Sequence, residues 1–484
     1  MIVNKRTAAS LSAAVKAFVD IPGPRTFPFL GSLSVLRFSE DAVHLYHEDL
    51  KKMYKKYGPI FKETYPLGQG PLVHVFSPDI AREVFAAEGR WPYIVPLQST
   101  TQKYRMMRGM NPGLGNLNGQ EWYRLRSGVS QAMMRPEAVF EYLPNVNQVA
   151  QSLVDHIAVN RDDKGEADMF VIAARWSLES AGLTVFEKRL GALTTNVAWA
   201  DELIKINKEA FRLSAKMRFL PLYKFATTPS WKRMIEIEDK YYWEIDRLSS
   251  EAIEKLTTAS DEDTIVKFAS KLINKPTLNV KDVKTILFSL FSDGLSTTAP
   301  TLIYNLFALA KNPDHQAKLR DEVTTVNTKG EEWTRELLNR VPYLRACIKE
   351  TFRMHTLTSE ISRIPQVDVE LGGYHVPAGT PVDIHTSLLG RDPAYFNDPE
   401  TFKPSRWNRD SDEKEESQPF LNIPFGHGPR MCAGRRFADQ DLMVVLAHLV
   451  ANYHISYNHG DLETSYEATI VPAGNLHFQF TPIQ

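Results

Sequence analysis

The residue best placed to do chemistry in this sequence is Cys432. It stands in residues 425–434, whose glycines and proline predict an irregular, tightly folded loop. A long amphipathic helix is predicted directly afterwards, over 434–451, so the sulfur lies among the free backbone N–H groups of a helix N-terminus. That environment favours a thiolate over a thiol. A thiolate held there is a metal ligand or a nucleophile; the alternative for any single cysteine is a buried, inert thiol.

The loop around Cys432 carries a longer pattern. It matches F-x-x-G-x-R-x-C-x-G at every fixed position, with Phe425 first and Arg430 two residues before the cysteine. This pattern resembles the haem-binding loop of the cytochrome P-450 superfamily. The resemblance implies that Cys432 is the axial thiolate on the iron of haem b, that Phe425 packs on the sulfur side, and that Arg430 pairs with a haem propionate. A thiolate ligand pushes electron density onto haem iron and favours O–O cleavage.

A tryptophan and an arginine earlier in the chain fit the same resemblance. Trp122 and Arg126 are spaced i, i+4 on a helix predicted over 118–133, so they share a face. From the residues alone, a core tryptophan beside a surface arginine is an equally good interpretation. The resemblance places both at the haem propionates, and it suggests Arg363, just before an Ile-Pro pair, as a further propionate contact.

A charged triad is implied behind the loop. Glu350 and Arg353 form an E-x-x-R pattern on one face of a helix predicted over 342–354. Taken alone, such a pair is usually a solvated surface bridge. The superfamily uses these two residues with a later arginine, here Arg406, as a buried network that locks the haem loop through charge-assisted hydrogen bonds.

The segment from residue 293 to 298 resembles the oxygen-activating pattern A/G-G-x-D/E-T-T/S, inside a helix predicted over 280–311. Its glycine and both threonines match, but Ser296 stands where the superfamily has an acid. Asp293 lies four residues before Thr297 and can share its face. We expect Thr297 to donate a hydrogen bond during oxygen activation and Asp293, or ordered water, to relay protons. The alternative is a packing kink at the following proline, with hydroxyl groups that cap free carbonyls.

Four basic residues predict a docking surface for an electron donor. Arg345 and Lys349 are spaced i, i+4 on the predicted 342–354 helix, about 90° around the helix from the E-x-x-R pair. Arg435 and Arg436 open the helix after Cys432, where cations oppose the helix dipole. A compact basic patch suits an acidic ferredoxin. An ordinary solvated surface is the alternative for any one of them.

The composition bounds the fold. The chain has 484 residues with 43% hydrophobic and 24% charged, as in a folded soluble protein. With 57 basic and 58 acidic side chains it lacks the cationic field that nucleic-acid binding needs, and two cysteines exclude a disulfide scaffold. No linker or repeat divides it, so we expect one domain over 21–484, mainly α with minor β. The resemblance to the cytochrome P-450 superfamily implies that haem lies between a long central helix and the cysteine-loop helix. Helices are predicted over 118–133, 168–184, 197–216, 229–256, 280–311, 342–354 and 434–451, and strands over 60–65, 72–76, 366–371, 381–385 and within 466–480.

The first twenty residues predict a location. Lys5, Arg6 and Lys16 precede the first acid, Asp20, in a segment rich in Ala and Ser. That composition fits a mitochondrial transit segment over 1–20, with a frayed cationic terminus as the alternative. No run reaches the roughly 18 to 20 apolar residues that a membrane span needs.

Other motifs resemble the mitochondrial branch of the superfamily. They are residues 176–180 with 189–191, the basic pair before the E-x-x-R pattern, and the sequence after Cys432. We therefore expect a protein on the matrix side of the inner membrane. The aromatic and basic residues of 219–225 and 229–233 predict a monotopic membrane contact, with core packing as an equal alternative.

The expected function is that of a haem-thiolate monooxygenase. It would hydroxylate an apolar substrate, a sterol, steroid or similar lipid, with O₂ and electrons from a ferredoxin. A haem-thiolate isomerase or dehydratase is one alternative, and Thr297 with the basic patch argues against it. A non-catalytic haem-dependent sensor or sterol-binding protein is another, because Ser296 breaks the usual relay pattern. A microsomal-type enzyme fed by a flavoprotein is the third.

Overall fold

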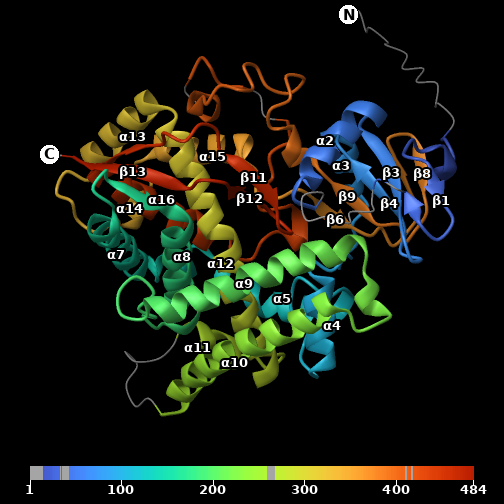
Figure 1. Ribbon diagram of the computed structural model, residues 1–484, viewed down its shortest axis with the longest axis horizontal. Helices are drawn as coiled ribbons and strands as arrows, with labels where there is room; N and C mark the ends of the chain where they lie inside the picture. Colours follow the sequence, from blue (N-terminus) through green and yellow to red (C-terminus); the bar gives the residue numbers. More distant parts are fainter. Residues whose placement is uncertain are drawn as a thin grey trace, which may run out of the picture.

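The arrangement of the chain is known from a computed structural model that describes residues 15–32, 34, 43–258, 267–408, 411–415 and 418–483. Strands β3, β4 and β9 lie with helices α2 and α3 on one side of Figure 1, and the long helices occupy most of the rest, together with β11, β12 and β13. Among the described residues, helix accounts for 55% and strand for 12%, which confirms the expected class of mainly α with minor β.

The long helices form where apolar residues recur at helical spacing, and most were predicted. Each predicted helix begins and ends within three residues of an observed one. These are α5 (Gly119–Met133), α8 (Met169–Phe186), α9 (Val197–Phe219), α10 (Pro229–Thr258), α12 (Val280–Ala310), α15 (Pro342–Met354) and α16 (Arg435–Asn452). The sequence analysis missed α2 (Tyr46–Tyr57), α3 (Pro78–Ala86), α4 (Ser99–Met107), α6 (Pro136–Phe140), α7 (Leu143–Asn160), α11 (Lys267–Ile273), α13 (Pro313–Val326) and α14 (Arg335–Leu338).

Helix α12 is the central element. Its start is fixed by a capping box, in which the Asn279 side chain accepts from the N–H of Asp282 and the Asp282 carboxylate accepts from the N–H of Asn279. Helix α8 packs along it, and the Ser177 hydroxyl donates to the Gly294 carbonyl at 3.0 Å. Both helices contain windows apolar enough to cross a membrane, but both lie in the core of the fold, with 78% of the α8 window and 50% of the α12 window buried.

The strands form small sheets that support the helices. The largest has the order β3-β4-β9-β6, in which β3 and β4 are antiparallel, β4 and β9 are parallel, and β9 and β6 are antiparallel. Beside it, β7 and β8 are joined by Gly372 and Gly373, both with positive φ, as a two-residue hairpin turn requires. The strands are β1 (Thr26–Phe27), β2 (Gly31–Ser32), β3 (Ile60–Tyr65), β4 (Gly70–Val75), β5 (Glu166–Asp168), β6 (Ile361–Arg363), β7 (Val369–Leu371), β8 (Tyr374–Val376), β9 (Val382–Ile384), β10 (Tyr453–Ser456), β11 (Glu463–Tyr466), β12 (Ile470–Ala473) and β13 (His477–Pro482).

Part of the predicted transit segment lies outside the described residues, namely 1–14. In the described part of this segment, Lys16 pairs with the β7–β8 hairpin. The N–H of Lys16 donates to the Gly373 carbonyl at 3.0 Å, and the Lys16 carbonyl accepts from the N–H of His375 at 2.9 Å.

Candidate active site

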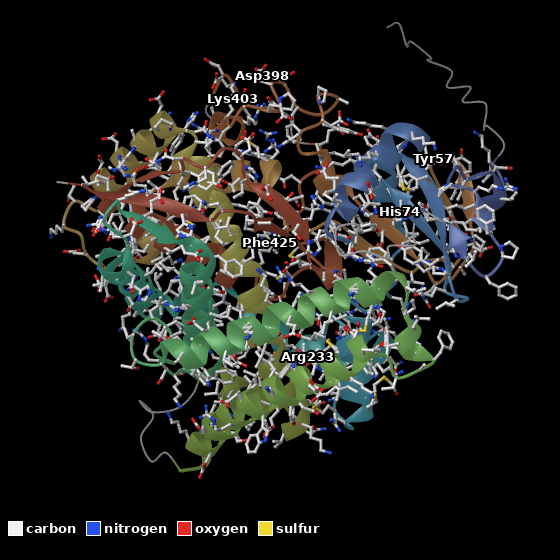
Figure 2. All side chains as sticks on the ribbon, in the orientation of Figure 1. Tyr57, His74, Arg233, Asp398, Lys403 and Phe425 are labelled. Carbon is white, nitrogen blue, oxygen red and sulfur yellow. The ribbon has the colours of Figure 1, made fainter. Side chains whose placement is uncertain are left out.

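The cysteine loop is held by its own backbone. The N–H of Cys432 donates to the Phe425 carbonyl at 2.8 Å, which closes the loop just before α16. Gly426 and Gly428 have φ of 74° and 69°, a conformation that side chains with a Cβ rarely adopt, so the first fixed glycine of the pattern, Gly428, and the neighbouring Gly426 are both required. The Phe425 ring meets the Phe352 ring of α15 edge-on at 5.4 Å and lies near the middle of the view in Figure 2.

Cys432 faces the interior without being covered by protein atoms. Its side chain is exposed, yet desolvation by the surrounding protein raises the pKa of its thiol. The N–H of Gly434 and the nearby Arg126 lower that pKa, but by less than burial raises it. The expectation that the helix terminus alone favours a thiolate is therefore wrong, because desolvation of the charged form outweighs it. Coordination to a metal would supply the missing stabilisation, since a ligating thiol is deprotonated.

Asp293 of α12 is a second side chain that is exposed yet desolvated. Burial in the protein raises the pKa of its carboxyl to about 6, while Arg105 acts to lower it. Its charge also raises the pKa of Cys432, so the two side chains lie close enough to interact. The Thr297 hydroxyl donates to the Asp293 carbonyl at 2.7 Å, and the Ser296 hydroxyl donates to the same carbonyl at 3.2 Å. The structure thus brings Asp293 and Thr297 together one turn apart, with Ser296 turned back onto its own helix.

Helix α12 continues through Pro300 to Ala310. The Thr301 hydroxyl, directly after the proline, donates to the Thr297 carbonyl one turn earlier at 2.8 Å.

The predicted propionate residues converge at one end of the loop. Arg430 donates to the carbonyls of Pro92 and Leu117 at 2.8 and 2.9 Å and to the Asn118 side chain at 2.7 Å. Arg126 donates to the Met431 carbonyl at 2.6 Å. Burial, then Arg363 and Arg126, lower the pKa of Arg430 to about 9, so the three guanidinium groups lie close enough to repel one another.

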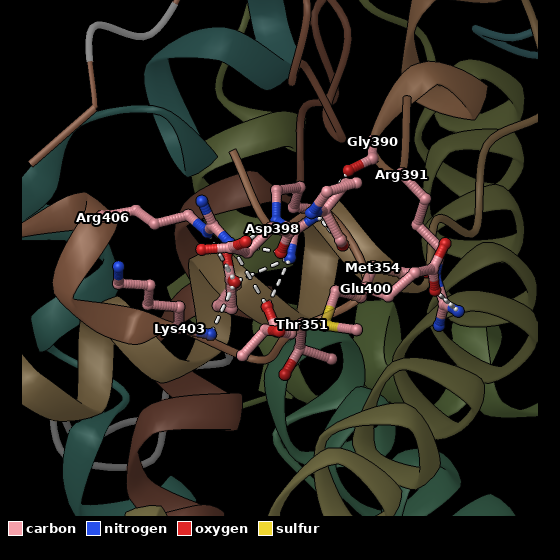
Figure 3. Close-up of polar contacts among 12 residues, drawn as sticks. Thr351, Met354, Gly390, Arg391, Asp398, Glu400, Lys403 and Arg406 are labelled. Carbon is pink, nitrogen blue, oxygen red and sulfur yellow. Dashed lines mark hydrogen bonds and ion pairs between the residues drawn. The ribbon is translucent and has the colours of Figure 1, made fainter. Parts of the chain in front are cut away.

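Glu350, Arg353 and Arg406 form a buried network (Figure 3). Arg353 makes two hydrogen bonds to the Glu350 carboxylate, at 2.8 and 2.9 Å, and Arg406 adds one at 3.1 Å. The Trp407 indole N–H and the Lys403 backbone N–H also donate to this carboxylate, at 2.9 and 2.8 Å. The other arginine donors reach backbone carbonyls, among them that of Gly390, except that Arg406 also pairs with the Glu415 carboxylate.

Three of the four residues of the predicted basic patch, Arg345, Arg435 and Arg436, lie near one carboxylate, that of Asp439. Arg435 lies 3.6 Å from Asp439, and the charges of Arg345 and Arg436 act on the same carboxyl. Arg436 donates to the Met134 carbonyl at 2.8 Å. Lys349 is exposed one turn beyond Arg345 on α15.

The comparison with protein families is decisive. A family model described as cytochrome P450 matches residues 21–480. The chain belongs to the cytochrome P450 family. A probable cytochrome P450 of Caenorhabditis elegans, CYP44, is 48% identical over 96% of this chain and 94% of its own length.

Relatives of this cytochrome P450 include enzymes named for steroid and secosteroid chemistry. The mitochondrial 1,25-dihydroxyvitamin D(3) 24-hydroxylase of Mus musculus is 29% identical over 96% of this chain and 89% of its own length. The mitochondrial cholesterol side-chain cleavage enzyme of Oncorhynchus mykiss is 26% identical over 100% of this chain and 94% of its own length. The expected enzyme class, a P450-type monooxygenase, and its cofactor, haem b, are confirmed at the level of the family.

The net charge of the arginine cluster in this cytochrome P450 matches the charge of the haem b propionates. Arg126, Arg363 and Arg430 converge, and Glu88, which pairs with Arg363, is the only carboxylate among their described contacts. Two positive charges therefore remain, and haem b carries two propionates. A thiol that is accessible yet desolvated stands beside them.

Sequence reasoning missed two residues of this site, Glu88 and Asn118. The Asn118 amide accepts from Arg430 and from the N–H of Ile94 at 3.0 Å, and it donates to the Ile94 carbonyl at 2.9 Å. Asn118 directly precedes α5, where a sequence pattern suggests no more than the start of a helix. Glu88 carries no motif, so its role is visible only in three dimensions.

Proposed function

We propose that this cytochrome P450 is a mitochondrial enzyme that hydroxylates a sterol, steroid or similar apolar lipid with O₂ and electrons from a ferredoxin. The observation that supports this most directly is that Cys432 and Asp293 are both accessible yet desolvated and interact electrostatically, with Thr297 one turn from Asp293 on α12. The names of two relatives, a 1,25-dihydroxyvitamin D(3) 24-hydroxylase and a cholesterol side-chain cleavage enzyme, support the substrate class.

Each residue of the site has a distinct proposed task. Cys432 is the axial ligand, Phe425 fixes its loop, and Arg126 and Arg430 hold propionates. Trp122 and Arg363 complete this group. We call the region formed by Trp122, Arg126, Arg363 and Arg430 the propionate end. When bound, the thiolate-ligated haem supplies the activation of dioxygen.

Proton delivery is proposed for α12. Asp293 is a carboxyl whose pKa of about 6 allows it to hold and release a proton near neutral pH. The Thr297 hydroxyl uses its hydrogen on the Asp293 carbonyl in this structure, so it must give up that hydrogen bond, by rotation of the O–H or of the side chain, before it donates elsewhere. Ser296 bonds to carbonyls of its own helix and takes no part in this relay.

The donor is proposed to dock on the basic patch of Arg345, Lys349, Arg435 and Arg436. Exposed cations near the cysteine loop would steer an acidic ferredoxin to the surface of the protein that lies closest to Cys432. Replacing Arg345 and Lys349 by Glu should raise the ferredoxin KM in a reconstituted reaction, and more so at low salt. Lys240→Glu, an exposed cation on α10, is the control; equal effects from both would exclude the patch.

A monotopic contact with the inner membrane, with residues 1–20 as transit segment, completes the proposal. The aromatic–basic segment divides in two: Phe219, Tyr223 and Trp231 are buried, whereas Leu222 and Phe225 are exposed at 44% and 70%. Lys103 of α4 donates to the Tyr223 carbonyl at 2.6 Å, which places α4 beside this exposed pair. The pair can therefore enter a bilayer interface while the rest of the segment stays in the core. Loss of vesicle flotation in Phe225→Asp would test this.

The deciding experiment is a reduced carbon monoxide difference spectrum followed by turnover with ferredoxin, its reductase, NADPH and a panel of sterols and secosteroids. A thiolate-type band with reductant-dependent product supports the proposal. Product formed without reductant would indicate an isomerase or dehydratase, and stoichiometric ligand binding without turnover would indicate a binding protein.

A further inference from the structure

Glu88 joins three parts of the propionate end. It follows α3 and its carboxylate pairs with Nε of Arg363 on β6. Its other oxygen lies against the cysteine loop, 3.1 Å from where a Cβ on Gly428 would stand. The side chains of Glu88 and Arg363 are 9% and 4% exposed, so the ion pair is removed from water.

The pair is anchored on the loop that carries the ligand. Nη2 of Arg363 donates to the His427 carbonyl at 2.9 Å, one residue before Gly428. The other Nη of Arg363 donates to the Ser362 carbonyl at 2.8 Å. Glu88 therefore fixes an arginine that itself touches the cysteine loop.

The charges around Glu88 are mostly positive. Arg363 and Arg126 both lie near Arg430, and the Glu88 charge acts on Arg430 as well as on Arg363. One carboxylate thus partly compensates two guanidinium groups directly, with a third close to Arg430. A buried charge of this kind acts over a longer range than a surface charge, because neither solvent nor salt screens it well.

We propose that Glu88 is a positioning residue that sets the charge balance at the propionate end and thereby lowers the reduction potential of the haem iron. Reduction adds one electron to the haem, and a nearby carboxylate opposes that addition. Glu88 also keeps Arg363 directed at its own carboxylate, which limits the positive field that Arg363 exerts. The inference rests on haem binding at this site and is independent of substrate and electron donor.

The test is a spectroelectrochemical titration of the substrate-free holoenzyme. Glu88→Gln should shift the midpoint potential to more positive values, so that the ferrous-to-ferric ratio at the original midpoint rises several-fold. Because the pair is buried, the shift should persist at high salt. Arg363→Gln should shift the potential in the opposite direction, and Glu88→Gln/Arg363→Gln should fall between the two.

Two controls separate charge from structure. Asp79→Asn removes an exposed acid of α3, which pairs with Arg82, and should leave the potential unchanged. Glu88→Asp keeps the charge and should keep the potential even if haem content falls. An unchanged potential in Glu88→Gln, or equal shifts in Glu88→Gln and Glu88→Asp, would overturn the proposal. A non-thiolate spectrum with the same Glu88 effect would instead refute Cys432 as ligand and leave this inference standing.

Discussion

The guanidinium carbon of Arg430 lies 3.9 Å from the centre of the Trp122 indole ring. This contact joins the cysteine loop to α5, two segments that are about 300 residues apart in the sequence. The ring is 2% exposed, so the cation–π attraction acts without competition from water. Stacking fixes the plane of the guanidinium and therefore the direction of its donors.

Arg430→Lys should lower haem occupancy although it keeps the positive charge. A lysine ammonium cannot stack on Trp122 and donate to Pro92, Leu117 and Asn118 in the same fixed plane. The measurement is haem content per polypeptide after purification. Arg90→Lys, an exposed arginine that lies over Trp91 at 5.7 Å, should retain full occupancy. Equal occupancy in both variants would contradict a propionate role for Arg430.

Cys432→Ser should abolish the thiolate-type band in the carbon monoxide difference spectrum, because a serine hydroxyl is a much weaker ligand for haem iron. The second cysteine provides the control. Cys347 is 2% exposed on α15, and Cys347→Ala should keep the band while losing some stability. A band that survives in Cys432→Ser would rule out Cys432 as the ligand.

Asp293→Asn should reduce hydroxylation by about 10- to 100-fold and divert reductant to peroxide or water. The pKa of Asp293 is about 6, so its carboxyl is protonated below that pH and ionised above it. If the neutral acid is the donor, turnover of the unchanged enzyme should fall as pH rises through about 6. That step should be absent in Asp293→Asn, and Thr297→Ala should lower turnover while leaving the step in place. An identical pH profile in Asp293→Asn would show that another group titrates.

Asp441 should make folding stability depend on pH. It is 7% exposed on α16, and burial raises the pKa of its carboxyl to about 7, although the Ser180 hydroxyl donates to it at 2.5 Å. The folded state therefore binds a proton between about pH 4 and 7 that the unfolded state has released. Stability should fall across that range as pH rises, by on the order of 4 kcal/mol at most. Asp441→Asn should flatten the curve in urea unfolding between pH 5 and 8, and Asp155→Asn, an exposed acid of α7, should not.

Glu350→Gln should destabilise the fold by about 3 to 5 kcal/mol, because it leaves two buried arginines without their shared carboxylate. Chemical unfolding of the holoenzyme measures this. Glu400→Gln breaks the exposed pair with Arg391 that is also drawn in Figure 3, and it should cost less than about 1 kcal/mol. Equal costs for both variants would mean that the buried network carries no special weight.

The missed helices show where sequence patterns are weakest. Helices α7 and α13 were overlooked although each has a proline in its first turn, a position that favours helix initiation. Short strands such as β5 and β6 have three residues each, too few to show alternation. The long helices were predicted because one apolar face is enough to define them.

The sequence by itself determined the identity of the site. Three patterns identify it: the pattern around Cys432, the E-x-x-R pair and the Trp122–Arg126 spacing. Each needs particular residue types at fixed short separations, so each can be recognised from the sequence without a structure. Family membership and the cofactor class followed from them.

Only the tertiary structure decided how those groups behave. The pKa of Cys432 rises instead of falling because desolvation depends on atoms from the whole fold, not on the adjoining helix terminus. The charge of Asp293 acts on Cys432 although the two residues lie far apart in the sequence, and Glu88 pairs with Arg363 across 275 residues. Burial and long-range electrostatics sum over neighbours in space, and those neighbours are fixed only when the chain has folded.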